Sequence, residues 1–254
     1  MTRRSFVLLA LLAGCSKPAS TPPAVASIPY EPLPDGPGTR VLFIGNSHTF
    51  THNLPGMVEA MAKAGGKHVL QRSWAQGGTS LRDHLDRDAA KLLTRDKWDY
   101  VVLQQGASSL PESRADLKAS AIEWARLVRA KGAKPVLYMV WPRNAQADGF
   151  ALVSKSYREA GEAADCAVFA AGEAWNAALK DDPQLPLYSI DGNHADPAGT
   201  YLAALVVTHG LVGVRPDAVP STLDLGDVGP VEIPEGVAAK LRRAATAVID
   251  RAAK

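Results

Sequence analysis

From Arg40 onward, short apolar runs alternate with helical stretches, and this alternation constrains the fold of the 254-residue chain more than any other feature. Strand–helix–strand units form parallel sheets, and strands that are apolar along their whole length are buried on both faces. The predicted strands are Val41–Ile44, His68–Ser73, Trp98–Leu103, Lys134–Trp141 and Cys166–Phe169. Right-handed crossovers then predict a three-layer α/β/α sandwich around a five-stranded parallel sheet. Its ligand site should lie at the carboxyl ends of the strands.

The stretches between the strands predict the helices that cover the sheet. Pro111 sets the first turn of the longest one, and glycines end two of them. The expected helices are 54–64, 81–94, 111–131, 150–164, 197–210 and 236–253. The segment 214–235 is interrupted by prolines and predicts only a loop. We find no internal repeat and no second domain boundary after residue 40, so residues 40–254 are expected to form one domain.

The first residues are expected to be a targeting signal rather than part of the folded domain. Two arginines precede an apolar run, Phe6–Leu12, which is far shorter than the ~20 residues of a transmembrane helix. The segment Leu12–Cys15 resembles the bacterial lipobox, in which the cysteine is acylated and becomes the new N-terminus; an ordinary secretory signal is the alternative. We expect residues 1–14 to be a lipoprotein signal peptide and Cys15 to anchor the protein to a membrane of the cell envelope. Residues 15–39, rich in Pro, Ala and Ser, are expected to be a linker.

Charge and cysteine content narrow the partners and the chemistry. Without its two N-terminal arginines the chain has 28 − 2 = 26 basic residues against 26 acidic ones. A neutral chain with no basic stripe has no electrostatic footprint for a polyanion, so nucleic acid is not an expected partner. Cys166 opens an apolar run and is expected to be a core residue rather than a nucleophile.

Two short polar segments carry the residue types of a nucleophilic enzyme. Gly45-Asn46-Ser47 directly follows the first predicted strand, where a serine can stand above the sheet with its backbone N–H turned the same way as its hydroxyl. Asp191-Gly192-Asn193-His194 places a carboxylate three residues before an imidazole, close enough to orient it toward a hydroxyl. Taken singly, the first segment is more often a plain turn, and the second is more often a turn with a solvated histidine.

Together these segments resemble the SGNH hydrolases, also called the GDSL esterase and lipase superfamily, from about residue 40 to residue 210. The resemblance implies a flavodoxin-like SGNH fold and a catalytic triad. Ser47 would be the nucleophile, His194 the general base and Asp191 the residue that orients it. No metal or cofactor is implied.

The resemblance also implies an oxyanion hole, in which one block departs from the usual pattern. The backbone N–H groups of Ser47 and Gly77 match two donors, Gly77 being favoured over Gly78 by its spacing. Most members carry Gly-x-Asn-Asp after the third strand, whereas Gln105-Gly106-Ala107-Ser108 is similar to the Gln-Gly-Glu-Ser of carbohydrate acetylesterases. Gln105 is therefore the candidate for the third donor. Ser108 is its rival and also a candidate substrate contact.

The implied reaction is ester hydrolysis in two acyl-transfer steps. The third block and the expected surface anchor favour O-acetyl or another short acyl group on a carbohydrate as substrate. The alternatives are a lipid or thioester hydrolase and a non-catalytic carbohydrate-binding lipoprotein. Because an imidazole of reference pKa about 6.5 must start neutral, we expect activity to fall below roughly pH 6.

Five other side chains have more than one interpretation. Trp141, just past the fourth strand, could form a substrate wall or only cover core, and Arg143 could meet an anionic substituent of the substrate. His48 and His52 are four residues apart, but no third metal ligand is evident. His84 lies among acidic and basic residues and predicts a charged helix face.

Overall fold

The structure is a computed structural model that describes residues 30–144, 146 and 148–252. The expected signal peptide, the lipidation site Cys15 and the linker up to residue 29 lie outside the described residues. From Glu31 onward the chain forms one compact unit. Its main sheet has five parallel strands in the order β2-β1-β3-β4-β5. These are β1 (Thr39–Gly45), β2 (Val69–Ala75), β3 (Tyr100–Leu103), β4 (Lys134–Tyr138) and β5 (Ala167–Phe169).

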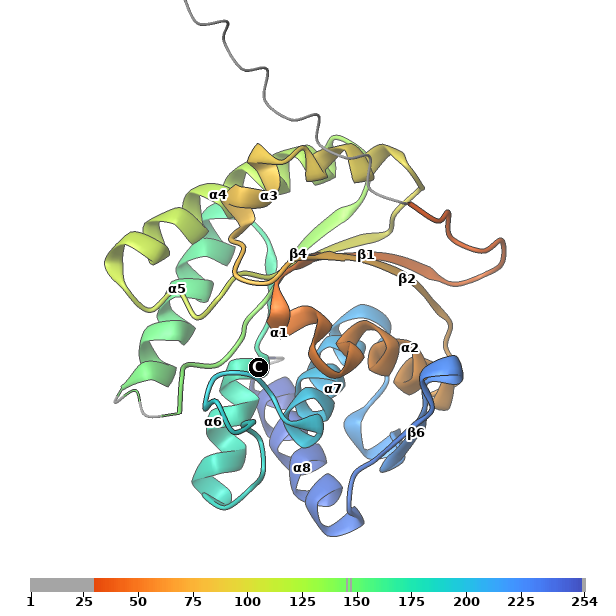
Figure 1. Cartoon of the computed structure of the whole chain (residues 1–254), viewed down its shortest axis with the longest axis vertical. Helices are drawn as coiled ribbons and strands as arrows, with labels where there is room; N and C mark the ends of the chain where they lie inside the picture. Colours follow the sequence, from red (N-terminus) through yellow and green to blue (C-terminus); the bar gives the residue numbers. More distant parts are fainter. Residues whose placement is uncertain (1–29, 145, 147, 253–254) are drawn as a thin grey trace, which may run out of the picture. The chain divides into compact units, whose positions relative to one another are not determined.

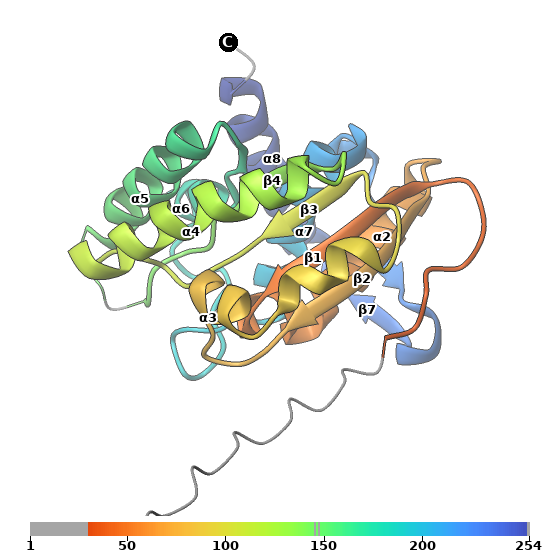
Figure 2. The same cartoon turned by 90° about the horizontal axis from the view of Figure 1, so that it is seen from above.

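Helices cover both faces of this sheet, which confirms the predicted three-layer sandwich. On one face lie α3, α4 and α5, and on the other α2, α7 and α8, as Figures 1 and 2 show. Their bounds are α2 (Leu54–Ala64), α3 (Leu81–Asp86), α4 (Pro111–Arg129), α5 (Gly149–Ala164), α7 (Pro197–Val212) and α8 (Glu235–Ala252). None of the helices in the described part of the chain is both long and apolar enough to cross a membrane.

Burial explains why the apolar runs became strands. Val41, Leu42, Phe43 and Ile44 of the central strand β1 are at most 1% exposed, because side chains on both faces of the strand meet a helical layer. Helix α7 shows the same effect in helical form. It is apolar all round, and most of its residues are buried between the sheet, α2, α6 (Ala171–Asp181) and α8.

A glycine lets α7 approach the chain that precedes it. A Cβ at Gly199 would lie 2.3 Å from the carbonyl oxygen of Leu187 and 2.5 Å from the indole of Trp175. Only a residue without a side chain fits this contact. The first turn of α7 is thereby held against the segment that carries Asp191 and His194.

Three elements differ from the sequence prediction. The helix expected over residues 81–94 is broken, because Asp88 adopts a left-handed conformation (φ 62°) between α3 and a 3₁₀ helix, Ala89–Thr94. Helix α6 was not predicted, although its buried positions repeat at helical spacing. The segment 214–235 holds an antiparallel ribbon of β6 (Thr222–Asp224) and β7 (Pro230–Glu232), whose three-residue strands are too short to show a period of two.

The last part of the expected linker is attached to the domain. Leu33 is buried, and its N–H donates to Asp96 Oδ2 at 3.2 Å. The guanidinium of Arg72 donates to the carbonyl oxygens of Glu31 and Pro32, both at 2.7 Å. Residues 31–33 of the expected linker therefore contact the domain.

Candidate active site

The carboxyl end of β1 and the turn before α7 bring Ser47 and His194 together across 147 positions of sequence. Ser47 is the first residue of the short helix α1 (Ser47–Phe50). Its Oγ lies 2.8 Å from His194 Nε2, and His194 Nδ1 lies 2.5 Å from Asp191 Oδ2. We call this Ser47–His194–Asp191 arrangement the hydrogen-bond chain. The juxtaposition predicted from the two sequence segments is present.

The turn around Asp191 explains the orientation of the imidazole. Asp191 Oδ1 accepts from the Ser189 hydroxyl at 2.7 Å and from the backbone N–H groups of Asn193 and His194 at 2.9 Å. These bonds, with that of Ser189 the largest, hold the pKa of Asp191 well below its usual value and keep it ionised. An ionised Oδ2 accepts the Nδ1 proton of His194, which leaves Nε2 free to accept from Ser47.

The same turn is anchored to the segment after β4. Trp141 Nε1 donates to the carbonyl oxygen of Asn193 at 3.0 Å, and Asn144 N–H donates to that of Gly192 at 2.9 Å. Trp141 is 1% exposed and stacks on Trp175, with ring centroids 3.7 Å apart. Trp141 is therefore a core residue that supports the turn, and its interpretation as a substrate wall is wrong.

A buried polar network lies beneath Ser47. Gln104 Oε1 accepts from the Asn46 N–H at 2.8 Å and the Thr49 hydroxyl at 2.7 Å, and Gln104 Nε2 donates to Asn46 Oδ1 at 2.9 Å. A Cβ on Gly45 would lie 2.3 Å from Thr49 Oγ1 and 2.5 Å from Gln104 Oε1. Sequence reasoning did not identify Gln104, although it fixes the turn that presents Ser47.

His84 belongs to this buried network, and its interpretation as part of a charged helix face was wrong. It is 0% exposed, and its Nε2 lies 2.7 Å from the carbonyl oxygen of Gly45 and 3.0 Å from Thr79 Oγ1. Burial lowers its pKa. Asn46 Nδ2 donates to the Thr79 carbonyl at 3.0 Å, so the loop after β2 is tied to the end of β1.

That loop presents two glycines to solvent beside β1. Gly77 and Gly78 are exposed, and Gly78 adopts a left-handed conformation (φ 73°). Among the described residues, the backbone N–H groups of Ser47, Gly77 and Gly78 have no acceptor. All three N–H groups therefore remain able to donate to a ligand.

Gln105 and Ser108, the two candidates for the third oxyanion donor, are used inside the protein. Gln105 Oε1 accepts from the Leu81 N–H at 2.9 Å, and its Nε2 donates to Ser108 Oγ at 3.2 Å and the Ser113 carbonyl at 3.4 Å. Ser108 Oγ donates to the Gly106 carbonyl at 3.0 Å. Both residues are buried. Their bonds tie the loop after β3 to α3 and α4, so neither side chain is free to act as an oxyanion donor or substrate contact.

Four other residues singled out in the sequence, Arg143, Cys166, His48 and His52, lie outside the hydrogen-bond chain. Arg143 is exposed on the loop after β4, and its guanidinium has no partner in the described parts of the chain. Cys166 is half-buried, and this partial burial raises the pKa of its thiol. His48 is 8% exposed and faces Trp141 and His194, whereas His52 is in a left-handed conformation (φ 50°). Over residues 30–144, 146 and 148–252 no group of three His, Cys, Asp or Glu side chains could hold a metal ion.

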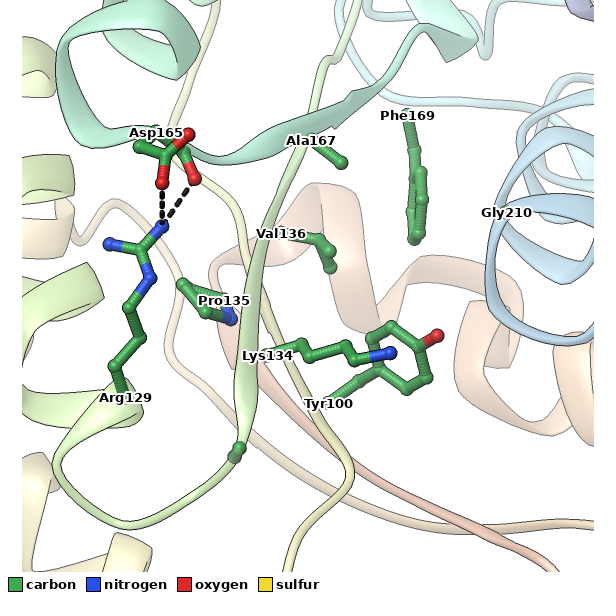
Figure 3. Close-up of a pocket in the computed structure, with 10 residues that line it drawn as sticks. Tyr100, Arg129, Lys134, Pro135, Val136, Asp165, Ala167, Phe169 and Gly210 are labelled. Atoms are coloured by element: carbon green, nitrogen blue, oxygen red, sulfur yellow. Dashed lines mark hydrogen bonds and ion pairs between the residues drawn. The ribbon is translucent and has the colours of Figure 1, made fainter.

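A cavity of about 360 Å³ lies at the opposite edge of the sheet (Figure 3). It is lined by Tyr100, Lys134 and Ala167, the first residues of β3, β4 and β5. The hydrogen-bond chain lies at the carboxyl ends of the strands. This cavity is therefore not part of the candidate active site.

Comparisons with known proteins agree with this architecture. No protein-family model and no curated sequence matches the chain. Among solved structures, a protein from Slackia heliotrinireducens that is classed with the SGNH hydrolases is 28% identical, with a TM-score of 0.59 over 68% of this chain and 98% of that one. A DUF4886 family protein from Bacteroides uniformis is 20% identical (TM-score 0.66, 86% and 97% covered). The acetyl xylan esterase AlAXEase is 15% identical (TM-score 0.58, 68% and 100% covered). The chain has the fold of SGNH/GDSL hydrolase-like proteins.

Proposed function

We propose that the protein is a serine esterase of the SGNH type, with Ser47 as nucleophile, His194 as general base and Asp191 as the group that orients His194. The observation that carries this proposal is the hydrogen-bond chain, in which a serine, an imidazole and an ionised carboxylate are joined at 2.8 and 2.5 Å. An ionised Asp191 stabilises the imidazolium that forms when His194 takes the Ser47 proton.

The reaction proceeds in two acyl transfers. Ser47 Oγ attacks the ester carbonyl carbon while His194 Nε2 accepts its proton, and the same proton passes to the leaving alcohol as the ester bond breaks. Water then attacks the acyl-enzyme with His194 again as base, releasing the acid and restoring Ser47. The side chains of His194 and Asp191 are 32% and 45% exposed, which leaves them open to an ester from solvent.

Backbone N–H groups provide the oxyanion hole in this mechanism. The backbone N–H groups of Ser47, Gly77 and Gly78 have no acceptor among the described residues. They follow the carboxyl ends of β1 and β2, the same edge of the sheet at which Ser47 meets His194. Gln105 is left out because its amide protons are used elsewhere. Donors fixed in the backbone need no reorganisation when charge develops on the carbonyl oxygen.

The substrate we propose is a carbohydrate that carries O-acetyl or another short acyl group. This proposal is supported by the likeness of the Gln105–Ser108 segment to carbohydrate acetylesterases and by the acetyl xylan esterase among the structures of similar fold. The exposed Arg143 is a candidate contact for an anionic substituent. Lipid anchoring at Cys15 would hold the enzyme in the cell envelope. Mass spectrometry and membrane fractionation of wild type and Cys15→Ala test this: we expect the variant to lack the mass of the acyl chains and to leave the membrane fraction.

A hydrolase for longer acyl chains is the second candidate function. Phe50, the last residue of α1, is 47% exposed, and Ile190, which precedes Asp191, is 108% exposed. Two large apolar side chains so close in sequence to Ser47 and Asp191 favour an apolar substituent on the ester. An acetyl group is too small to make comparable apolar contacts with these side chains.

The test compares p-nitrophenyl acetate with p-nitrophenyl octanoate as substrates of the purified full chain. The matched control for Ser47→Ala is Ser73→Ala, an exposed serine on β2. We expect S47A to lose at least ~10³-fold in kcat and S73A to keep the wild-type value. Preference for acetate supports the carbohydrate acetylesterase, and preference for octanoate supports the lipid hydrolase. Equal turnover by wild type and S47A, or none by either, would overturn the esterase proposal and favour a binding protein.

A further inference from the structure

His48 directly follows the nucleophile, but no step of the mechanism uses it. Its ring is buried and stacks on Trp141, with centroids 5.3 Å apart and planes 7° from parallel. It also stands nearly perpendicular to the His194 ring, with centroids 5.5 Å apart and an interplanar angle of 74°. On the basis of the proposed function, we infer that His48 is a positioning residue for the catalytic base. Its ring backs the imidazole of His194 and holds Nε2 in line with Ser47 Oγ.

Trp141 connects the two histidines to one rigid group. One face of its indole stacks on Trp175, and its Nε1 donates to the carbonyl oxygen of Asn193, immediately before His194. The indole is therefore fixed against the core and against the turn that carries His194. A ring stacked on that indole is fixed relative to the same turn, so a side chain on α1 and a side chain 146 positions away share one support.

Stacking, rather than hydrogen bonding, holds the His48 ring. Nδ1 is buried without a partner in the part of the chain that the structure describes, and its ring makes no hydrogen bond there. The hydrogen bonds of His48 in the described part of the chain are made by its backbone: the N–H donates to Asn46 Oδ1 at 3.1 Å, and the carbonyl oxygen accepts from the Tyr138 hydroxyl at 3.4 Å. A flat apolar ring should therefore replace the imidazole without loss of position.

The ring must also stay uncharged. His194 becomes a cation each time it takes the Ser47 proton, and a second cation beside it would oppose that step. Burial, reinforced by repulsion from His194 and opposed by Asp191, lowers the pKa of His48 to about 4. At neutral pH the His48 ring is therefore uncharged.

Two variants separate the flat ring from the imidazole chemistry. His48→Phe keeps a flat neutral ring, and His48→Leu keeps buried volume without one. His68→Ala, an exposed histidine at the amino end of β2, is the control. Two readouts are taken: kcat and KM for p-nitrophenyl acetate, and the NMR resonance of the His194 Nδ1 proton, expected far downfield because Asp191 lies 2.5 Å away.

We expect H48L to lower kcat about 10- to 100-fold with KM within about threefold, since a small displacement of a catalytic group is that costly. H48F should remain within about fivefold of the wild-type kcat, and H68A should match wild type. The downfield resonance should persist in H48F and broaden or shift in H48L. A wild-type kcat and an unchanged resonance in H48L would overturn the inference.

The NMR readout keeps this inference separate from the proposed function. Should the wild-type protein hydrolyse no ester, the esterase proposal fails, but a resonance that depends on the flat ring at position 48 would still support positioning. Should wild type be active and H48L be equally active with the same resonance, only the positioning role fails. Far-UV circular dichroism checks that each variant is folded, and H48F carries the test if H48L is not: loss of its activity and of its resonance would contradict the ring-only role.

Discussion

Acid should destabilise this protein through His48 before it protonates most carboxylates. Burial holds the pKa of His48 at about 4, against an ordinary value of 6.5. Between these two values the unfolded chain binds a proton that the folded protein refuses. Stability due to this group is therefore complete above pH 6.5, falls as the pH drops toward 4, and changes little below that.

The size of the effect follows from the two pKa values. A pH of 5 lies about 1.5 units below the pKa of the unfolded imidazole, which is therefore almost fully protonated, whereas the folded one is largely neutral. This difference lowers the free energy of unfolding by about 2 kcal/mol relative to pH 7. With a urea m-value of about 2 kcal/mol/M, the unfolding midpoint should fall by about 1 M from this residue. His84 and the carboxylates add their own pH dependence.

The assay isolates His48 by difference. Urea unfolding is followed by tryptophan fluorescence at pH 7 and pH 5 for wild type and His48→Phe, since the chain has five tryptophans. The other titrating groups are common to both proteins, so the extra loss in wild type reports His48. Equal losses in the two proteins would refute the claim that His48 is kept neutral by burial.

Three substitutions test the rest of the site. Ser189→Ala removes one of three donors to Asp191 Oδ1 and should lower kcat about 10-fold with little change in KM; an unchanged kcat would show that the two backbone donors suffice. Gly45→Ala pushes a methyl group into the Gln104 network and should cost about 1–3 kcal/mol, lowering Tm by several degrees in differential scanning fluorimetry; an unchanged Tm would contradict the packing. Gln105→Ala should lower Tm, because it removes the bonds that tie the loop to α3, and should leave kcat nearly unchanged. A loss of kcat of ~10²-fold or more would instead identify Gln105 as an oxyanion donor.

Strand ends were the most predictable part of the site. Parallel strands bring their carboxyl ends to one edge, so a serine just after β1 and an imidazole just before α7 can be expected to meet there. The helices 54–64 and 150–164 agree with the structure within one residue, because apolar spacing, prolines and glycines define such segments locally. Helix α6 was missed although its buried positions repeat at helical spacing, and the β6–β7 ribbon was missed because its three-residue strands are too short to show a period of two.

Neighbouring residues with the same chemistry could not be told apart. Gln104 and Gln105 are adjacent and identical, yet Gln104 fixes the Ser47 turn and Gln105 ties the loop to α3 and α4. In an extended chain consecutive side chains point to opposite sides, so a shift of one position exchanges their surroundings. In the sequence His84 is likewise one more polar residue on a charged helix. Only the structure shows that its Nε2 lies 2.7 Å from the carbonyl oxygen of Gly45 at the end of β1.

The sequence by itself determined the layered α/β architecture, the edge of the sheet where Ser47, Asp191 and His194 would lie, and the residue types available there. These follow from patterns within short stretches of chain, in which burial on one or both faces selects apolar side chains at regular positions. Only the tertiary structure decided which amide supports the nucleophile, that Trp141 is buried, and that His48 stands against His194. Such contacts join residues far apart in sequence, and their energies depend on distances and angles that no local pattern records.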